Sequence, residues 1–500
     1  MLNLALMNNK EQSDLNINDV SRCNSKKNDL DINLIKDKIP SDKSNFNLSL
    51  NRNLYSANFE YDNLDFELEN KHNKNFFKRL FDSIKPGSLR GSTFAMASLT
   101  FGGGCLSFPY AIAQSGPLIG FVIFFITGLL SYITISYLFE NGYSTRLMDY
   151  NDLTEGVLSR NWRISTDILN LIGCIGAIIS YQYIITNLSL QVLHYFFNTP
   201  CDGITKIIQI IIAGTLIQIP LCSLKDISKL QYVCLVGTIS LGLSILVVIL
   251  ECPFYIYQYF NNYSNNTIPI FPPKDSNIDL SYSWIDTIGI FLFGFTSHNG
   301  IFQVFQELER PGKRRCRKVI NRSFIIELVF YFLLSLAGFL SSFYQTPDVF
   351  LKRKNLIGFN DYFIIIVRIL LVITMNSTIA VNYNVMRMSI NSMVFKEKPS
   401  NLIDFSIVVI VIIISNVLNY LIKNAGTLLS FVGGFSLVLI CFVVPILIDL
   451  KANPKNKKGL RKYFNYLFMI IVILVSIVCT IKGIYDFSTN DSIEDICKDI

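Results

Sequence analysis

Long apolar runs recur through most of this chain, and they constrain its fold more than any other feature. An α-helix needs about 20 apolar residues to cross roughly 30 Å of hydrocarbon. Runs of that length follow one another from Ser92 to Phe487. Only 16% of the residues are charged, whereas soluble chains carry about 25%. The sequence therefore excludes an ordinary soluble enzyme and predicts an all-α polytopic membrane protein.

Eleven apolar segments are long enough to be membrane spans. We expect them at about residues 89–113, 117–139, 166–197, 204–222, 229–252, 284–306, 323–345, 359–385, 402–422, 425–449 and 463–485. Lysines and arginines are concentrated in the loops that share the N-terminal side of these spans. The positive-inside rule therefore places the N-terminus in the cytosol and accounts for the net charge of +7 without a nucleic-acid partner.

The two ends of the chain differ from the membrane domain, which we expect at 86–490. Residues 1–85 are rich in Asn, Asp, Ser and Lys without a sustained apolar period, which predicts a disordered cytosolic tail. An odd number of spans puts the short tail at 491–500 on the outer or lumenal face. Two glycosylation sequons, at Asn262 and Asn265, fall on that same face.

Histidine and cysteine usage argues against a metal or catalytic centre. The chain has three histidines and eleven cysteines, and no C-x-x-C pair. A metal-dependent membrane enzyme should show clustered His, Asp and Glu ligands. A phosphate-binding loop of the G-x-x-x-x-G-K-[ST] type does not occur either. We therefore expect neither an enzyme nor a cofactor, and no ATP-driven pump.

Two of the predicted spans contain residues that break helices. The first has three consecutive glycines, Gly102 to Gly104, followed by Pro109. The sixth has a polar run, Thr-Ser-His-Asn, between Gly294 and Gly300. In hydrocarbon, irregular backbone is tolerated only where protein or a watery cavity satisfies its polar groups. The two breaks therefore predict a binding site.

The positions of the breaks predict an internal repeat. They open the first and sixth spans, so the chain divides into two sets of five, at about 89–252 and 284–449, with the eleventh span at 463–485 outside both. An odd number of spans per repeat inserts the second copy upside down. Inverted repeats with broken leading helices are typical of secondary transporters that bind substrate near the membrane midplane.

The residues at the breaks also resemble a known family. The segment Gly102–Gly116, GGGCLSFPYAIAQSG, resembles the opening helix of the amino acid/auxin permease family, which includes sodium-coupled neutral amino acid transporters and vacuolar amino acid transporters. Phe293–Leu308, followed by a basic loop, is similar to that family's sixth helix. The match covers about 90–490. It implies a LeuT-like fold with a 5+5 inverted repeat, an eleventh helix, and amino acids as substrates.

An amino acid needs an anion site, a cation site and room for its side chain. Unpaired N–H groups after the first break offer the anion site. Carbonyls at both breaks and nearby hydroxyls offer the cation site. Polar residues of the third span are pocket candidates, although hydrogen bonding between helices is the simpler interpretation of each. The predicted substrate-binding residues are Ser98, Gly102, Gly103, Gly104, Cys105, Tyr181, Asn187, Gly294, Thr296 and Ser297.

The coupling ion is either sodium or a proton. Asn376, Ser377 and Thr378 form an oxygen-rich patch in the eighth span, and hard cations favour oxygen ligands. By the resemblance, Asn376 and Thr378 stand at the family's ion-linked positions, which predicts a possible sodium site. Ser98, however, occupies a position that is asparagine in sodium-coupled members, and this difference favours protons.

His298 is the first titratable candidate for proton coupling, because imidazole titrates in the physiological range. We prefer a structural interpretation, in which it hydrogen-bonds the unwound backbone of the sixth span. Glu327 and Arg368 lie deeper in the seventh and eighth spans, and the sequence assigns neither a coupling role.

These observations favour an ion-coupled transporter of amino acids that acts as a single chain, in the plasma membrane or a vacuolar or lysosome-like membrane. The alternative is an amino-acid sensor that keeps the transporter fold and signals through its N-terminal tail.

Overall fold

The computed structural model describes part of the chain, all of it within the compact unit Asn58–Ile500. The described residues are 87–101, 103–200, 202–224, 227–262, 283–309, 311–352, 362–395, 400–421, 425–452 and 460–489. They form helices and turns, and no strand occurs among them. The expected tails at 1–85 and 491–500, Gly102, the Asn265 sequon and the side chain of Asn262 lie outside the described residues.

The first half of the domain begins with an interrupted helix. Its elements are α5 (Leu89–Thr100), η1 (Gly103–Ser107), α6 (Phe108–Ser115), α7 (Pro117–Thr145), α8 (Tyr150–Val157), α9 (Arg160–Phe197), α10 (Gly203–Ile212), η2 (Ala213–Gln218), α11 (Ile219–Cys222) and α12 (Ile227–Asn262). The short helix α8 was not predicted. Its start is fixed by Asp149, whose carboxylate accepts hydrogen bonds from the backbone of Asn151 and Asp152.

The second half repeats this order. Its elements are α13 (Ser283–Gly294), η3 (His298–Gly300), α14 (Ile301–Glu307), α15 (Lys313–Ser342), η4 (Phe343–Gln345), η5 (Phe350–Lys352), α16 (Tyr362–Val394), α17 (Asn401–Leu421), α18 (Ala425–Val432), η6 (Gly433–Leu437), η7 (Leu439–Val443) and α19 (Val444–Ala452), followed by α20 (Leu460–Thr489). Ten segments of the described chain are long and apolar enough to span a membrane. The interrupted α5–η1–α6 segment stands where the first predicted span was expected.

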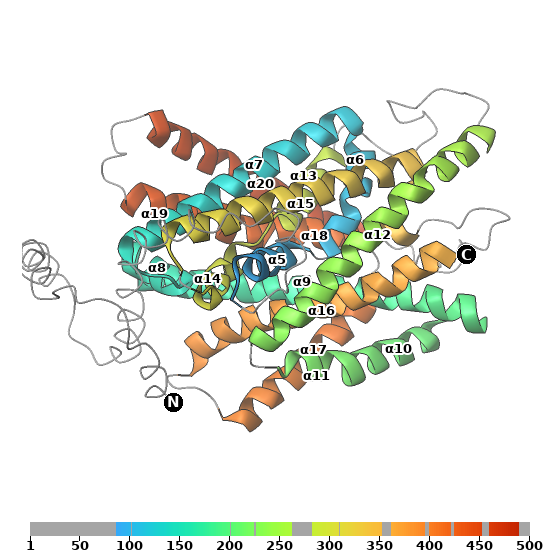
Figure 1. Ribbon diagram of the computed structural model, residues 1–500, viewed down its shortest axis with the longest axis horizontal. Helices are drawn as coiled ribbons and strands as arrows, with labels where there is room; N and C mark the ends of the chain where they lie inside the picture. Colours follow the sequence, from blue (N-terminus) through green and yellow to red (C-terminus); the bar gives the residue numbers. More distant parts are fainter. Residues whose placement is uncertain are drawn as a thin grey trace, which may run out of the picture. The chain divides into compact units, whose positions relative to one another are not determined.

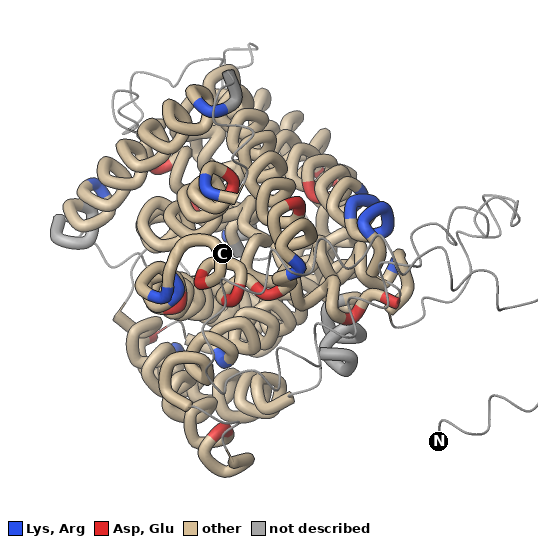
Figure 2. The backbone as a smooth tube through the Cα atoms, turned by 90° about the vertical axis from the view of Figure 1, so that its left-hand side faces the viewer, with Lys and Arg blue, Asp and Glu red and all other residues tan. Residues whose placement is uncertain are grey.

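The interrupted helices lie in the centre of the bundle. The most apolar window of the α13–η3–α14 segment is 83% buried, whereas those of α10–η2–α11 and α17 are each 22% buried. In Figure 1, α5 lies in the middle of the bundle, and it packs against α12, α15 and α16. Figure 2 shows few charged residues along the helices. The breaks are therefore surrounded by protein, as irregular backbone in a membrane requires.

The peripheral helices present large apolar side chains outward. Leu118 of α7, Leu216 of η2 and Leu402 of α17 are 77%, 70% and 77% exposed. A soluble protein would not expose so many aliphatic residues along several helices, whereas a lipid-facing surface requires them. The apolar exterior and the central breaks thus have the same cause, which is immersion in hydrocarbon.

Candidate functional site

The first break is held by hydroxyls from the second half of the chain. α5 ends at Thr100, and Phe101 leaves helical geometry with φ −69° and ψ 79°. The hydroxyl of Tyr331 on α15 donates to the carbonyl of Thr100 at 2.5 Å. Thr378 on α16 donates to the carbonyl of Phe101 at 2.9 Å. Two carbonyls that lose their helical partners therefore gain side-chain donors.

The second break is held by side chains from the first half. Ser131 on α7 donates to the carbonyl of Phe295 at 2.6 Å. Thr134, one turn further along α7, lies 2.8 Å from Nε2 of His298. Asn299 donates to Asn170 on α9 at 2.5 Å. Each break is thus satisfied by the second and third helices of the opposite repeat.

Glycines allow the two breaks to cross in contact. A Cβ atom at Gly104 would lie 2.7 Å from the Phe293 ring and 3.2 Å from the Cα atom of Gly294. A Cβ atom at Gly294 would lie 2.2 Å from the ring of Phe108. These distances are far below van der Waals contact. Gly104 and Gly294 are therefore required for packing, which is a more direct reason for glycine than close approach of a substrate.

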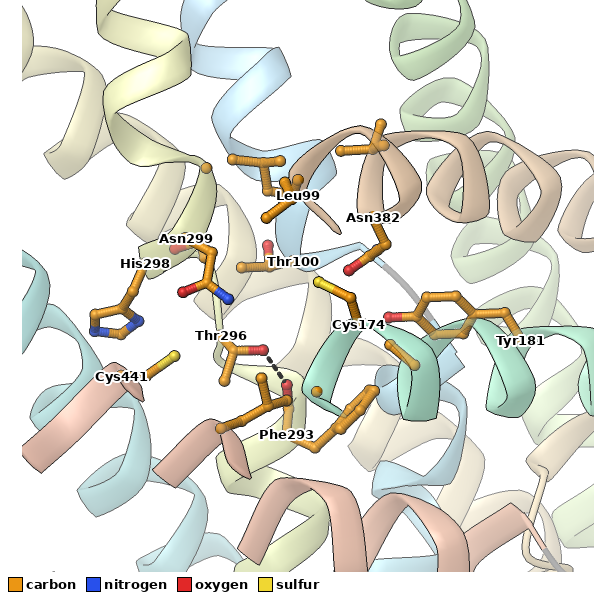
Figure 3. Close-up of a pocket in the computed structure, with 17 residues that line it drawn as sticks. Leu99, Thr100, Cys174, Tyr181, Phe293, Thr296, His298, Asn299, Asn382 and Cys441 are labelled. Carbon is orange, nitrogen blue, oxygen red and sulfur yellow. Dashed lines mark hydrogen bonds between the residues drawn. The ribbon is translucent and has the colours of Figure 1, made fainter. Parts of the chain in front are cut away.

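A cavity of about 40 Å³ lies between the breaks. It is lined by Leu99, Thr100, Gly173, Cys174, Ala177, Tyr181, Phe293, Thr296, Ser297, His298, Asn299, Gly300, Val381, Asn382, Val385, Leu437 and Cys441. No lysine, arginine, aspartate or glutamate occurs in this described lining. In Figure 3 the Tyr181 hydroxyl points into the space, whereas the imidazole of His298 points away from it.

The cavity is small for an amino acid. At about 10–15 Å³ for each water, its volume holds roughly three water molecules. Asn299 and Val385 also line a second cavity of about 30 Å³, towards the end of the bundle where α8 begins. Between them Asn170 donates to Ser389 at 2.7 Å and accepts from Asn299. The described residues therefore leave little open space between the two breaks.

The structure brings only some of the predicted substrate residues to this cavity. Tyr181, Thr296 and Ser297 line it, and the hydroxyl oxygen of Ser297 is buried without a hydrogen-bond partner among the described residues. Thr296 donates to the carbonyl of Phe293 at 2.7 Å. By contrast, Asn187 is buried away from the cavity, six residues along α9 from Tyr181.

The remaining first-span candidates do not line the described cavity. Gly104 and Cys105 are buried, but they pack in the helix crossing. Ser98 faces α12, where the Thr238 hydroxyl donates to it at 3.4 Å. Gly103 begins η1 directly after the undescribed Gly102.

The predicted ion residues point in different directions. An α-helix turns 100° for each residue, so Asn376 and Thr378 project about 200° apart on α16. Thr378 contacts the first break, whereas the amide of Asn376 donates back to Val372 of its own helix. Ser377 lies against α12, beside Gly237. The structure does not bring Asn376 and Thr378 together around one ion.

Tyr331 and Glu327 were not predicted as parts of the site. Tyr331 is fully buried, and its hydroxyl also reaches the carbonyl of Gly294 at 3.3 Å, so one side chain bridges both breaks. Glu327 lies one turn earlier on the same face of α15 and hydrogen-bonds the side chain of Thr100. A glutamate four residues before a tyrosine in an otherwise apolar span is the signal that could have identified both.

Sequence comparison finds related transporters. The chain is 22% identical over 473 residues to human sodium-coupled neutral amino acid transporter 4, covering 81% of this chain and 86% of the relative. It is 24% identical to the putative amino acid transporter AAT1 of Plasmodium berghei, covering 56% of this chain and 44% of the relative. The match to the Plasmodium falciparum protein of the same name, at 23% identity, covers 64% and 50%. The chain therefore spans about half the length of these Plasmodium relatives.

Solved structures of similar fold include two crystal structures of the Eremococcus coleocola manganese transporter. One, of a mutant, has a TM-score of 0.56 at 13% identity and covers 84% of this chain and 90% of the other. The second, in complex with an aromatic bis-isothiourea substituted compound, has a TM-score of 0.54 at 13% identity and covers 81% and 88%. These likenesses show the fold alone, and they confirm the LeuT-like arrangement expected from the matched breaks.

The family model described as transmembrane amino acid transporter protein matches residues 85–489. This range contains every helix described above, including both breaks. The expected resemblance is thus confirmed, and the chain belongs to the transmembrane amino acid transporter family.

Proposed function

We propose that this protein is a secondary active transporter that carries uncharged amino acids across a membrane by alternating access, coupled to an ion gradient. The observation that carries the proposal is the small cavity between two crossed, interrupted helices, whose described lining has no formal charge. A zwitterion has no net charge, so backbone dipoles and hydroxyls at the breaks are sufficient partners for it. A cationic or anionic side chain would lack a counter-ion there.

Polar groups for the substrate are present at the cavity. The Ser297 hydroxyl has no partner among the described residues, and the Tyr181 hydroxyl points inward. We assign these two groups to substrate binding. The N–H groups around Gly103, Gly104 and Cys105 remain candidates for the carboxylate, since they follow the break. Gly102 stays a prediction of the same kind.

Alternating access is supported by the hydrogen bonds next to the cavity. Transport requires the Asn170–Asn299–Ser389 contacts to separate in one state, because they lie between the two cavities. A second group of contacts lies at η5, which packs against α6, α9 and η1. There the Lys352 ammonium lies 2.9 Å from the Asp348 carboxylate and 3.1 Å from the Tyr183 hydroxyl. We propose that these two groups of contacts open in turn.

Topology and assembly follow from the same proposal. The positive-inside rule puts the N-terminus in the cytosol. One chain contains both breaks and the cavity, so a single chain is the transport unit. The membrane is the plasma membrane or a vacuolar or lysosome-like membrane, and the coupling ion is a proton or sodium.

Uptake into proteoliposomes tests the proposal. Purified protein would be offered a panel of labelled amino acids, with sodium and pH gradients imposed separately. We expect uptake of amino acids with uncharged side chains, reduced by Ser297→Ala and Tyr181→Phe. The matched control is Tyr132→Phe, because that hydroxyl bonds Asn321 at an exposed position. Absence of uptake and of amino-acid exchange under every gradient would refute the transport assignment.

A further inference from the structure

A carboxyl group is buried beside the first break, where the sequence assigned no function. Glu327 is 3% exposed and lies within a membrane-spanning helix. It forms no ion pair with a described residue, and the Thr100 side chain is its hydrogen-bond partner. Ionisable side chains inside a membrane are expensive to bury and usually serve a function. A structural role alone would not require a titratable group.

Thr100 connects this carboxyl to the cavity. It is the last residue of α5, and it lines the cavity between the breaks. Tyr331 follows Glu327 by one helical turn and donates to the Thr100 carbonyl. The carboxyl therefore lies behind the end of the broken helix, separated from the cavity by one residue.

The protonation of Glu327 affects the hydrogen bonds at the end of α5, because few donor protons are available there. The Thr100 hydroxyl has one proton, which it donates to the Ala97 carbonyl at 2.7 Å. The proton of Tyr331 goes to the carbonyls of Thr100 and Gly294, although its hydroxyl also reaches the Thr100 side chain. When protonated, the carboxyl can donate to the Thr100 oxygen while Thr100 keeps its hydrogen bond to the Ala97 carbonyl.

Loss of the proton changes these hydrogen bonds. A carboxylate accepts but cannot donate, so it must draw the proton of the Thr100 or the Tyr331 hydroxyl. Either hydroxyl would then turn away from a carbonyl at the end of α5, that of Ala97 or that of Thr100, and the last turn of the helix would lose a hydrogen bond. A buried carboxylate without a donor is the costlier alternative. Protonation of one group thus sets the hydrogen bonding at the end of the broken helix.

No basic side chain that the structure describes near Glu327 is placed to neutralise a carboxylate there. Among residues whose side chains the structure describes, the helices packed against α15 carry Arg90 at the start of α5, Glu140 near the end of α7 and Glu251 on α12. None of these forms an ion pair with Glu327. Glu327 therefore has no basic partner among the described residues of its surroundings.

We propose that Glu327 is the proton-binding group of this transporter and that its protonation is coupled to the conformation of the first break. The proposal rests on the transport function proposed above. The proton moves between the Glu327 carboxyl and water on the side to which the site is open, and no covalent bond of the substrate changes.

The test compares driven uptake with exchange in proteoliposomes. Glu327→Gln keeps the size of the side chain and cannot change its charge. We expect uptake driven by a pH gradient to fall by about 5- to 150-fold, the usual range of coupling between linked sites. Exchange of labelled for unlabelled amino acid, which needs no net proton movement, should be retained within about threefold, well below that coupling range. Glu140→Gln is the matched control, because this exposed carboxyl pairs with Arg317 away from the cavity, and it should keep proton-driven uptake.

A second measurement, made on the wild-type protein, keeps the proposal testable if Glu327→Gln does not fold. Infrared difference spectra of the wild-type protein, with and without amino acid, should show a change in a protonated carboxyl band, which shifts in Glu327→Asp. An unchanged carboxyl spectrum, or a Glu327→Gln variant with full proton-driven uptake, overturns the proposal. Wild-type protein that exchanges amino acids but ignores a pH gradient overturns it while leaving transport intact. Wild-type protein without exchange overturns both.

Discussion

The polar groups at the two helix breaks find hydrogen-bond partners in different ways. At the first, the backbone carbonyls of Thr100 and Phe101 accept hydrogen bonds from Tyr331 and Thr378. At the second, polar side chains of the break itself, including His298, form hydrogen bonds with α7 and α9. The glycine-rich break has no side chains to contribute, so its partners must come from elsewhere. The polar break contributes its own side chains to two of the three contacts described above.

Each repeat supports the break of the other. α15 and α16 support the first break, and α7 and α9, the corresponding helices of the other repeat, support the second. Movement of either repeat therefore disturbs the break of the other. The symmetry fails at one point, because α15 carries a carboxyl at the first break while α7 offers only hydroxyls at the second.

The largest effect is expected where the breaks touch. In Gly294→Leu the new Cβ atom would lie 2.2 Å from the Phe108 ring. In Gly104→Leu it would lie 2.7 Å from the Phe293 ring. We expect both variants to reach the membrane and to show no measurable uptake. Their thermal stability in detergent should fall, because overpacking typically costs about 1–3 kcal/mol. Gly203→Leu is the control, since its nearest neighbour, Tyr420, lies at 3.8 Å. Normal transport by Gly294→Leu would show that the breaks do not cross as described.

A smaller loss is expected when the bridging hydroxyl is removed. Tyr331→Phe leaves the carbonyls of Thr100 and Gly294 without this donor while keeping the aromatic packing. Leaving a buried polar group unsatisfied costs about 1–3 kcal/mol, which corresponds to roughly 5- to 150-fold in initial uptake rate if the closed state is affected. Uptake and melting temperature should be measured together. A Tyr331→Phe variant that behaves like Tyr132→Phe would mean that the first break does not depend on α15.

The contact of α16 with the first break should matter less. Thr378→Val removes the donor to Phe101 at nearly constant volume, and a typical hydrogen bond contributes about 0.5–1.5 kcal/mol. We expect a loss of roughly 2- to 13-fold in uptake with no change in sodium dependence, because a proton is the expected coupling ion. Thr215→Val is the control, because this exposed hydroxyl donates to the Ile211 carbonyl of its own helical segment. If Thr378→Val selectively loses sodium-driven uptake, sodium binds at Thr378 and the expectation that a proton is the coupling ion is wrong.

The sequence predicted the local features of this molecule well and its long-range contacts poorly. The spans and both breaks follow from apolar length and from glycine and proline, which act on the chain where they stand. The hydrogen bond from Tyr331 to Thr100 joins residues that are far apart in sequence, so no local pattern predicts it. The separation of Asn376 from Thr378 is different, because it follows from the 100° rotation per residue of a helix, which places these two polar side chains on different faces.

The smallest effect is expected at His298, and it separates the two breaks most sharply. The Thr134 hydroxyl lies 2.8 Å from Nε2 of the imidazole, which donates or accepts in this hydrogen bond according to its tautomer. A glutamine amide carries both an N–H donor and a carbonyl acceptor, so it can replace the imidazole in either role. His298→Gln should therefore change uptake by less than about threefold and leave its pH profile unaltered, since a typical hydrogen bond contributes only about 1 kcal/mol and here it is replaced. His298→Leu, which cannot donate, should lose more. A pH profile between about 5.5 and 7.5 that flattens in His298→Gln, around the usual pKa of histidine, would move the titrating group from the first break to the second.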